Sequence, residues 1–584
     1  MSVLSSLVRA YDRLPDAPPP GFSSEKISFC ISLNEDGAVA HVIDLRDSSG
    51  KKPQPRLMLV PQPVKRTAGI APNTFWDKTS YVLGVTAGEG KRTEAEHAAF
   101  VELHQTLLAN CEDVGLKALL RFLKTWVPDQ FVSPDWPEDM KDQNVIFALE
   151  SDRLSNLYLH DRPAAKALWA AAGSEGQSAG QVCLVSGSRG AVARLHPSVK
   201  GVWGAQSSGA ALVSFNLDAF TSYGHEQGDN APVSEDAAFK YTTALNRFLE
   251  KGSSHRLQIG DASTVFWADA ADMKKAELAE ELFAGYFDPD PAKEEDNAVK
   301  DIGIFLSRLR KGERLQDLDL DLEESVRFFV LGLAPNAARL SVRFYFEDSF
   351  GHLTRNYQSF IQDMRIEPAP RDGYPPLWRY LRETAVLGKS ENVPPNLAGE
   401  WMRAILSGGR YPLSLLAAVL TRIRADGELN ALRVGILKAI LVRNFKGEAP
   451  VALDPDFDNR GYLLGRLFAA YERAQTAALG TKVNATIKDK FYGAASAQPR
   501  KVFSLLESGS SNHLSKVGKQ SPGLRINLEK LIASIMGNMR ADGNPFPASL
   551  TAEEQALFGL GYYHQRNEFF KKTIETADAG EASQ

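Results

Sequence analysis

Short runs of alternating apolar and polar residues occupy the first part of the chain, and this period of two is typical of β-strands. Residues 27–33 and 38–45 alternate in this way on either side of Asp36-Gly37, a dipeptide that favours a hairpin turn. The same pattern predicts further strands at residues 57–60, 145–150, 191–196, 211–216 and 264–268.

The most regular alternation runs over residues 339–346. One face of this predicted strand would carry the apolar side chains Leu340, Val342, Phe344 and Phe346. The other face would carry Arg339, Arg343 and Tyr345. A basic and aromatic face suits single-stranded RNA, whose bases stack on Tyr or Arg, but the solvated face of an edge strand has the same composition.

The pattern changes after a Pro-rich stretch at residues 367–376. Beyond it apolar residues recur every three or four positions, as on one face of a helix, over residues 416–423 and 464–471. A second break, at residues 446–461, divides this helical part. We therefore predict an α+β fold, in which a β-rich mixed α/β N-terminal region precedes an all-α helical bundle. The predicted domains are 1–366, 377–455 and 456–584.

A helix start is also visible near the C-terminus. Thr551 and Glu554 have the spacing of a capping box, in which each side chain binds the backbone N–H of the other residue. Lys571-Lys572 suits the other end of the same helix, because cations stabilise the C-terminal end of the helix dipole. The sequence therefore predicts a helix from Thr551 that ends at this lysine pair.

Composition places the chain among ordinary globular proteins, since 43% of its 584 residues are apolar and 24% are charged. This length leaves room for about three or four domains. Cys30, Cys111 and Cys183 are an odd number and lie far apart, which argues against a disulfide framework and favours a reducing cytosol. No run approaches the roughly eighteen apolar residues of a membrane span, so we expect a cytoplasmic protein with no membrane contact.

The net charge of −5 hides an uneven distribution. Residues 378–540 contain 24 Lys and Arg against 13 Asp and Glu, a net charge of +11, whereas the first 377 residues carry −12. A basic helical segment points to nucleic acid. A solvated helical surface whose counter-charges lie elsewhere in the fold would give the same count.

Motifs of common enzyme sites are missing from the sequence. There is no GxxxxGK[ST] loop for phosphate, no GxSxG elbow and no HExxH helix. His160-Asp161 could begin a metal-dependent nuclease site, but the ten histidines form no cluster around it. Residues 204–210 are rich in Gly and Ser and could hold phosphate, or form a tight turn between strands. We predict no catalytic residues, no metal and no cofactor.

Several long segments carry a family resemblance. They include KRTAGIAPNTFWDKTSYVLG from residue 65, HPSVKGVWGAQSSGAALVSF within 193–246, LGLAPNAARLSVRF from residue 331, YLLGRLFAAYERAQ from residue 462 and ATIKDKFYGAASAQPRKVF from residue 485. Over nearly its whole length the chain resembles the large subunit of the type I-C CRISPR effector complex (Cascade), a CRISPR-associated protein of the Dvulg subtype. The resemblance implies a non-catalytic subunit that reads the PAM on duplex DNA, helps to unwind the target and stabilises the R-loop.

The implied partners follow from the same family. They are the crRNA, double-stranded target DNA with its PAM, the displaced non-target strand, the Cascade backbone and crRNA-processing subunits, a separate helicase-nuclease and an internally translated small subunit. The break at residues 446–461 is where that product should begin. Because Met402, Met536 and Met539 do not fit this break, we predict a non-AUG start at Val451 or at a Leu near residue 463.

Candidate DNA-binding residues lie in the first matching segment: Lys65, Arg66, Asn73 and Lys78. An Asn amide can pair with base edges and cations can hold phosphates, which suits PAM reading. The alternative is that Pro72-Asn73 forms a turn, and we expect Trp76 to be a core anchor. Candidates for the crRNA handle or the duplex fork are Lys200, Gln206, Ser207, Ser208, Arg339 and Arg343, although a hairpin turn would explain the serines equally well. Trp203, Phe215 and Phe220 are expected in the core.

Candidates for a strand-binding groove come from the basic helical part. They are Arg422, Arg424, Arg433, Lys438, Arg443, Arg466, Arg473, Lys488, Lys490, Arg500 and Lys501. Binding along such a groove would depend strongly on salt, whereas ordinary surface charge would bind nothing in particular. Two rival functions remain at this stage: an HD-type DNA nuclease, and a purely architectural subunit that never reads DNA.

Overall fold

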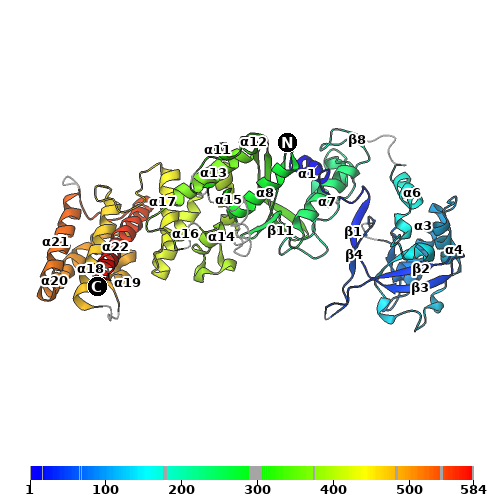
Figure 1. The fold of residues 1–584 in the computed structure, drawn as a ribbon, viewed down its shortest axis with the longest axis horizontal. Helices are drawn as coiled ribbons and strands as arrows, with labels where there is room; N and C mark the ends of the chain where they lie inside the picture. The colour runs from blue at the N-terminus through cyan, green and yellow to red at the C-terminus, as the bar shows by residue number, and fades with distance from the viewer. Residues whose placement is uncertain are drawn as a thin grey trace. The chain divides into compact units, whose positions relative to one another are not determined.

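The structure is a computed structural model of the chain. It describes residues 2–15, 17–50, 52–64, 66, 69–174, 181–287, 305–306, 308–309, 311, 313–371, 375–480, 485–539 and 544–581. The chain forms two compact units (Figure 1). The first unit consists of Met1–Lys200 and Ser207–Arg247, and the second of Gly201–Gln206 and Phe248–Gln584.

A four-stranded mixed sheet forms the centre of the first unit. Its order is β3 (Val39–Asp44), β2 (Phe29–Leu33), β6 (Asn144–Leu149), β5 (Asp77–Lys78), with β2 and β6 parallel and the other pairs antiparallel. All five residues of β2 are buried, because α3 (Thr93–Leu107) and α4 (Val114–Thr125) supply the core on one face and a smaller apolar cluster covers the other. The predicted hairpin between β2 and β3 is confirmed.

That smaller cluster includes the inner face of a two-stranded antiparallel ribbon, β1 (Phe22–Ile27) with β4 (Arg56–Pro61). The first unit also contains the helices α1 (Val3–Tyr11), α2 (Thr79–Val82), α6 (Pro163–Ser174) and α7 (Glu235–Leu249). The strands predicted at 191–196 and 211–216 are wrong. Neither segment forms a strand: the first contains the isolated bridge of Val192 with Ser234, and the second follows the isolated bridge of Ala210 with Val199.

An antiparallel sheet begins the second unit. Its order is β12 (Arg339–Ser349), β11 (Arg327–Asn336), β10 (Ala262–Asp269), β9 (Arg256–Ile259), and α8 (Met273–Phe287) and α13 (Phe350–Met364) pack on it. The predicted strands at 264–268 and 339–346 are confirmed. The predicted single apolar face of β12 is not confirmed. The pairing register shifts opposite Gly332/Leu333, and Val342 is 48% exposed whereas Leu340 and Phe344 are buried.

Helices follow the sheet to the end of the second unit, and one continuous apolar core joins them to it. They are α14 (Leu377–Arg382), α15 (Pro395–Ser407), α16 (Leu413–Asp426), α17 (Ala431–Phe445), α18 (Arg460–Leu479), α19 (Ile487–Ala497), α20 (Phe503–Gln520), α21 (Pro522–Gly537) and α22 (Ala552–Glu581). The predicted α+β class, with strands first and a helical bundle afterwards, is confirmed. The division into 1–366, 377–455 and 456–584 stays a prediction, since compactness alone does not show which segments act as domains.

The last helices pack unusually closely. A Cβ atom at Gly465 of α18 would overlap the backbone oxygen of Phe558 of α22, and one at Gly561 of α22 would overlap that of Tyr462. The predicted capping box opens α22, where Glu554 N–H donates to Thr551 Oγ1 at 3.2 Å. The helix continues to Glu581 instead of ending at the lysine pair. In the described part of the chain, no helix is long and apolar enough to cross a membrane.

Candidate nucleic-acid interface

The chain that leaves β4 forms a loop that is fastened from within the first unit. Trp76 Nε1 donates to the Pro61 carbonyl at 2.7 Å, and Asn73 Oδ1 accepts the Val64 N–H at 2.9 Å. The Asn73 N–H donates to the Asp77 carboxylate at 2.8 Å. Trp76 is a core anchor, as predicted. Asn73 is only 4% exposed, so in this conformation it holds the loop and does not present its amide to solvent; its role in reading DNA stays a prediction.

A buried histidine that the sequence did not suggest fixes the middle of this loop. Phe75 has φ +66°, a left-handed conformation that a non-glycine residue adopts at a cost. Its N–H donates to His104 Nε2 at 2.8 Å, and His104 Nδ1 bonds the Phe100 carbonyl at 2.8 Å. Burial lowers the pKa of His104 to about 4, so the ring is neutral and can accept this bond. His104 lies on an ordinary helix, and no local motif marks it.

The fastened loop brings cations from three segments to one pocket of about 330 Å³. Arg66 pairs with the buried Asp77, donates to the Ala71 carbonyl and lies 4.1 Å over the Tyr81 ring. Lys78 is exposed at the end of β5. Arg92, which the sequence did not single out, completes the lining. Lys65 lies outside the described residues. Two of the predicted PAM residues therefore share one site with a third, unforeseen cation.

The pocket also contains acids. Glu96 and Asp142 line it beside the three cations, and Asp142 accepts the Thr86 hydroxyl at 2.6 Å and a backbone N–H at 3.2 Å. Arg92 is anchored by donating to the Gly69 carbonyl at 2.9 Å. Fixed cations around an open polar pocket are suited to an anionic group such as a phosphate.

Four of the six predicted handle or fork residues lie on an exposed turn. Val199 and Ala210 exchange both backbone hydrogen bonds at 2.9 Å and close it. Its exposed residues include Lys200, Gln206, Ser207 and Ser208. The Lys200 ammonium lies 3.5 Å from the Glu25 carboxylate. The turn explains the Gly- and Ser-rich sequence by itself, and the contact with nucleic acid stays a prediction.

The aromatic residues of the same segment do not lie in the core as expected. Trp203 is 67% exposed and Phe220 is 36% exposed, while Phe215 is half-buried. Trp203 belongs to a turn, and residues 211–216 form no strand whose alternate side chains could share a buried face.

The basic face predicted on β12 is paired with acids. Arg343 lies 2.6 Å from the Asp261 carboxylate, and the Tyr345 hydroxyl donates to Glu347 at 3.0 Å. Glu347 also pairs with Arg327 from β11. Arg339 is half-buried. These contacts neutralise much of the positive charge that motivated the RNA-binding interpretation of this strand.

Three of the predicted groove cations are buried, and a fourth, Arg443, is half-buried. Arg433, Lys438 and Arg466 are 4%, 4% and 3% exposed. Lys438 Nζ donates to the Asp363 carbonyl at 3.0 Å, and Arg443 binds the Asp363 carboxylate at 2.6 Å. Burial lowers the pKa of Lys438 and of Arg466. The net charge of the helical part therefore overstates its surface charge, and strand binding by these four side chains stays a prediction.

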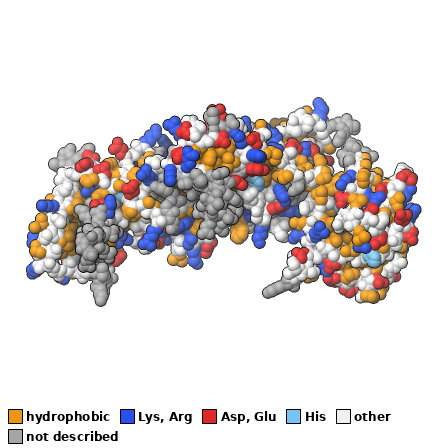
Figure 2. Space-filling view, viewed as in Figure 1, with side chains coloured by type: hydrophobic (Ala, Val, Ile, Leu, Met, Phe, Trp, Pro, Cys, Tyr) orange, Lys and Arg blue, Asp and Glu red, His pale blue; other side chains and the backbone are white. Residues whose placement is uncertain are grey.

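The other groove candidates lie nearer the surface. Arg422 and Arg424 contact Asp426 and Gln555, respectively. Lys488 and Arg473 are half-buried, and Lys490, Arg500 and Lys501 are exposed. Figure 2 shows Lys and Arg side chains interspersed with Asp and Glu on the face that it draws, without one continuous basic stripe.

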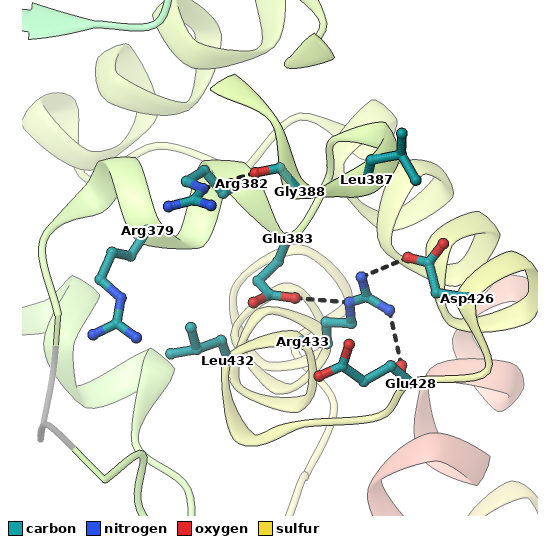
Figure 3. A pocket seen from close by; sticks show the side chains of 9 residues that line it. All are labelled: Arg379, Arg382, Glu383, Leu387, Gly388, Asp426, Glu428, Leu432 and Arg433. Carbon is teal, nitrogen blue, oxygen red and sulfur yellow. Dashed lines mark hydrogen bonds and ion pairs between the residues drawn. The ribbon is translucent and has the colours of Figure 1, made fainter. Parts of the chain in front are cut away.

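The second unit has a larger pocket, of about 470 Å³ (Figure 3). It is lined by Arg379, Arg382, Glu383, Leu387, Gly388, Asp426, Glu428, Leu432 and Arg433. At its base Arg433 donates to Glu383 at 2.8 Å and to Asp426 at 2.7 Å. Arg433 thus positions carboxylates inside a pocket.

The His160-Asp161 pair has no metal-site geometry around it. His160 is 1% exposed and stacks on Tyr158 with ring centroids 5.8 Å apart. Among the residues that the structure describes, no group of three His, Cys, Asp or Glu side chains is arranged to hold a metal ion.

Comparison with known proteins identifies a family. The family model of the CRISPR-associated protein (Cas_Csd1) matches residues 7–570, almost the whole chain. No curated protein matches the chain.

Proposed function

Because the chain belongs to the Cas_Csd1 family of CRISPR-associated proteins, we propose that it is the DNA-recognising, non-catalytic large subunit of a type I-C RNA-guided surveillance complex. Membership makes it a component of Cascade, which works with other CRISPR-associated subunits and a crRNA. The observation that carries the DNA-recognising role is the convergence of Arg66, Lys78 and Arg92 on one pocket.

The proposed role divides recognition between protein and RNA. The three cations hold phosphates beside the PAM, and the loop that carries Arg66 and leads into β5 with Lys78 is preorganised by Trp76 and His104. Opening of the duplex then lets the crRNA pair with the target strand, which supplies the sequence specificity. The surface cations of the helical part follow the displaced strand, and a separate helicase-nuclease carries out cleavage.

A gel-shift series on the assembled complex tests this role. Lys78→Ala and Arg92→Ala should weaken binding of a PAM-containing duplex and reduce the salt dependence by about 0.9 per lost phosphate contact. Lys91→Ala is the matched control, because Lys91 adjoins Arg92 but is 82% exposed and paired with Glu89. Unchanged affinity in both variants would contradict the proposal.

The same series separates the rivals. An architectural subunit would bind matched and PAM-mutated duplexes equally. A nuclease would show metal-dependent cleavage that His160→Ala abolishes.

For the internally translated small subunit, the structure favours the earlier of the two predicted starts. Buried Arg466 donates to the carbonyls of Asp454 and Pro455, at 3.3 and 3.0 Å. A product that begins at Val451 keeps both acceptors, whereas one that begins near residue 463 leaves a buried charge poorly satisfied. Mass spectrometry of the C-terminal product from the intact gene would identify its first residue, and a start beyond Pro455 would contradict this assignment.

A further inference from the structure

The larger pocket of the second unit has a charged and preorganised base. Arg433, itself 4% exposed, holds the carboxylates of Glu383 and Asp426 and also donates to the Glu428 carbonyl at 2.9 Å. Asn430 Nδ2 also donates to Glu383 at 3.1 Å, and Arg422 also donates to Asp426 at 3.3 Å. A carboxylate has about four acceptor sites, so both can still accept further hydrogen bonds. The side chain of Glu428 is exposed at the opening. The base of the pocket therefore offers hydrogen-bond acceptors to donors that enter it.

Cations stand on another side of the pocket. Arg379 and Arg382 project from α14 toward the space, as Figure 3 shows. Arg382 Nε donates to the Gly388 carbonyl at 2.8 Å, which fixes the guanidinium, and its Cζ lies 5.9 Å from the centre of the Trp378 ring. Trp378 is 43% exposed. This side offers fixed positive charge beside an aromatic surface.

A leucine at the rim of the pocket has a backbone conformation that leucine disfavours. Leu387 has φ +58°, a left-handed backbone conformation that is costly for leucine. Its side chain is 78% exposed, so burial of apolar surface does not offset this cost. Two side chains fix the backbone around it: Arg382 on the Gly388 carbonyl, and Asn392 Nδ2 on the Val386 carbonyl at 3.0 Å. Strain of this kind, when the surroundings maintain it, is typical of ligand-binding positions.

We propose that this pocket binds one nucleotide of a single-stranded nucleic acid, with the base inside. The phosphate lies against Arg379 and Arg382, Leu387 and Leu432 contact the base, and the carboxylates accept hydrogen bonds from its exocyclic amino group. The volume of about 470 Å³ falls within the range of small-molecule sites. The site shares no residue with the proposed PAM-side pocket and goes beyond that function.

The chemistry of the pocket sets its preferences. Carboxylates accept from the exocyclic amino groups of adenine, cytosine and guanine, which thymine and uracil lack. A single strand is favoured over a duplex, because its bases enter a pocket without the cost of breaking pairs. The phosphate contacts alone would treat all bases alike, so base preference distinguishes a true pocket from a basic patch.

The test uses the purified full-length chain and fluorescein-labelled hexamers in an anisotropy titration. The probes are dA, dC and dT hexamers, the RNA hexamer of adenine, and a hexamer whose six sites are abasic. We expect the dA and dC hexamers to bind more tightly than the dT hexamer. The abasic hexamer should bind about tenfold more weakly than dA, a loss within the range of affinity that one bound base contributes. Whichever adenine hexamer binds more tightly, DNA or RNA, identifies the kind of single strand that the pocket binds.

Variants assign the binding to this pocket. Leu387→Ala should weaken dA binding about tenfold, and Glu428→Gln should reduce the preference for dA over dT while keeping the side-chain shape. Lys389→Ala is the control, because Lys389 adjoins the rim, is 57% exposed and does not line the pocket. Equal binding of intact and abasic hexamers, no binding of any hexamer, or wild-type affinity in Leu387→Ala would each overturn the proposal.

Discussion

The buried His104 makes the loop of the PAM-side pocket sensitive to acid. Protonation of Nε2 would remove the acceptor of the Phe75 N–H and leave a charge in the core of the first unit. His104→Gln is the informative change, because an amide has both an acceptor and a donor but does not titrate. We expect this variant to fold and to lose part of the acid sensitivity of the wild type.

The size of the effect follows from the shift in pKa. A histidine in the unfolded chain titrates near pH 6.5, whereas burial lowers the pKa of His104 to about 4 in the folded protein. The unfolded chain therefore takes up the proton first, so this contribution is complete above pH 6.5 and is lost as the pH falls toward 4. By this linkage, the loss between pH 7 and pH 5 is about 2 kcal/mol.

Urea unfolding of the purified chain at pH 7 and at pH 5 measures this loss, with Trp fluorescence as the signal. His564 of α22, whose pKa burial also lowers to about 4, retains its own acid sensitivity in the variant. The difference in pH dependence between wild type and His104→Gln isolates His104. Identical pH dependence of the two proteins would refute the assignment of a neutral, acceptor His104.

Three further changes test other parts of the structure. Arg433→Ala should destabilise the second unit by about 3 kcal/mol, because it removes the ion pairs of the buried guanidinium with Glu383 and Asp426; urea unfolding measures this, and a loss below about 1 kcal/mol would contradict a structural ion pair. Gly561→Val should prevent the close approach of α18 and α22 and lower the melting temperature, whereas an unchanged melting temperature would contradict the packing. Lys490→Ala should lower the salt dependence of R-loop formation by about 0.7 without changing stability, and an unchanged salt slope would remove Lys490 from the strand path.

Local sequence was enough to predict those strands and helix ends that depend only on neighbouring residues. The period of two at residues 264–268 and 339–346 corresponds to β10 and β12, and the capping box at Thr551 opens α22. These patterns arise from how neighbouring residues share a face or satisfy the first backbone groups of a helix. The α+β class and the family followed from the order of such patterns and from long matching segments.

Only part of the candidate site could be predicted from local sequence. Arg66 and Lys78 belong to one segment, so a motif could select both, but Arg92 and His104 join them only because α3 packs on the sheet. Nothing in a list of cations distinguishes the buried Arg433 from the exposed Lys490. Burial depends on what packs against a side chain, and that is decided by residues far away in the sequence.

The sequence by itself thus determined which segments have the pattern of a strand or a helix, that a basic helical part follows a β-rich part, and which family the chain resembles. The tertiary structure decided which alternating segments find a partner strand, which charges lie inside, and which loops meet at a pocket. The physical reason is the range of the interactions. Backbone geometry and capping act over a few residues, whereas pairing, burial and convergence of charges need contacts between distant segments.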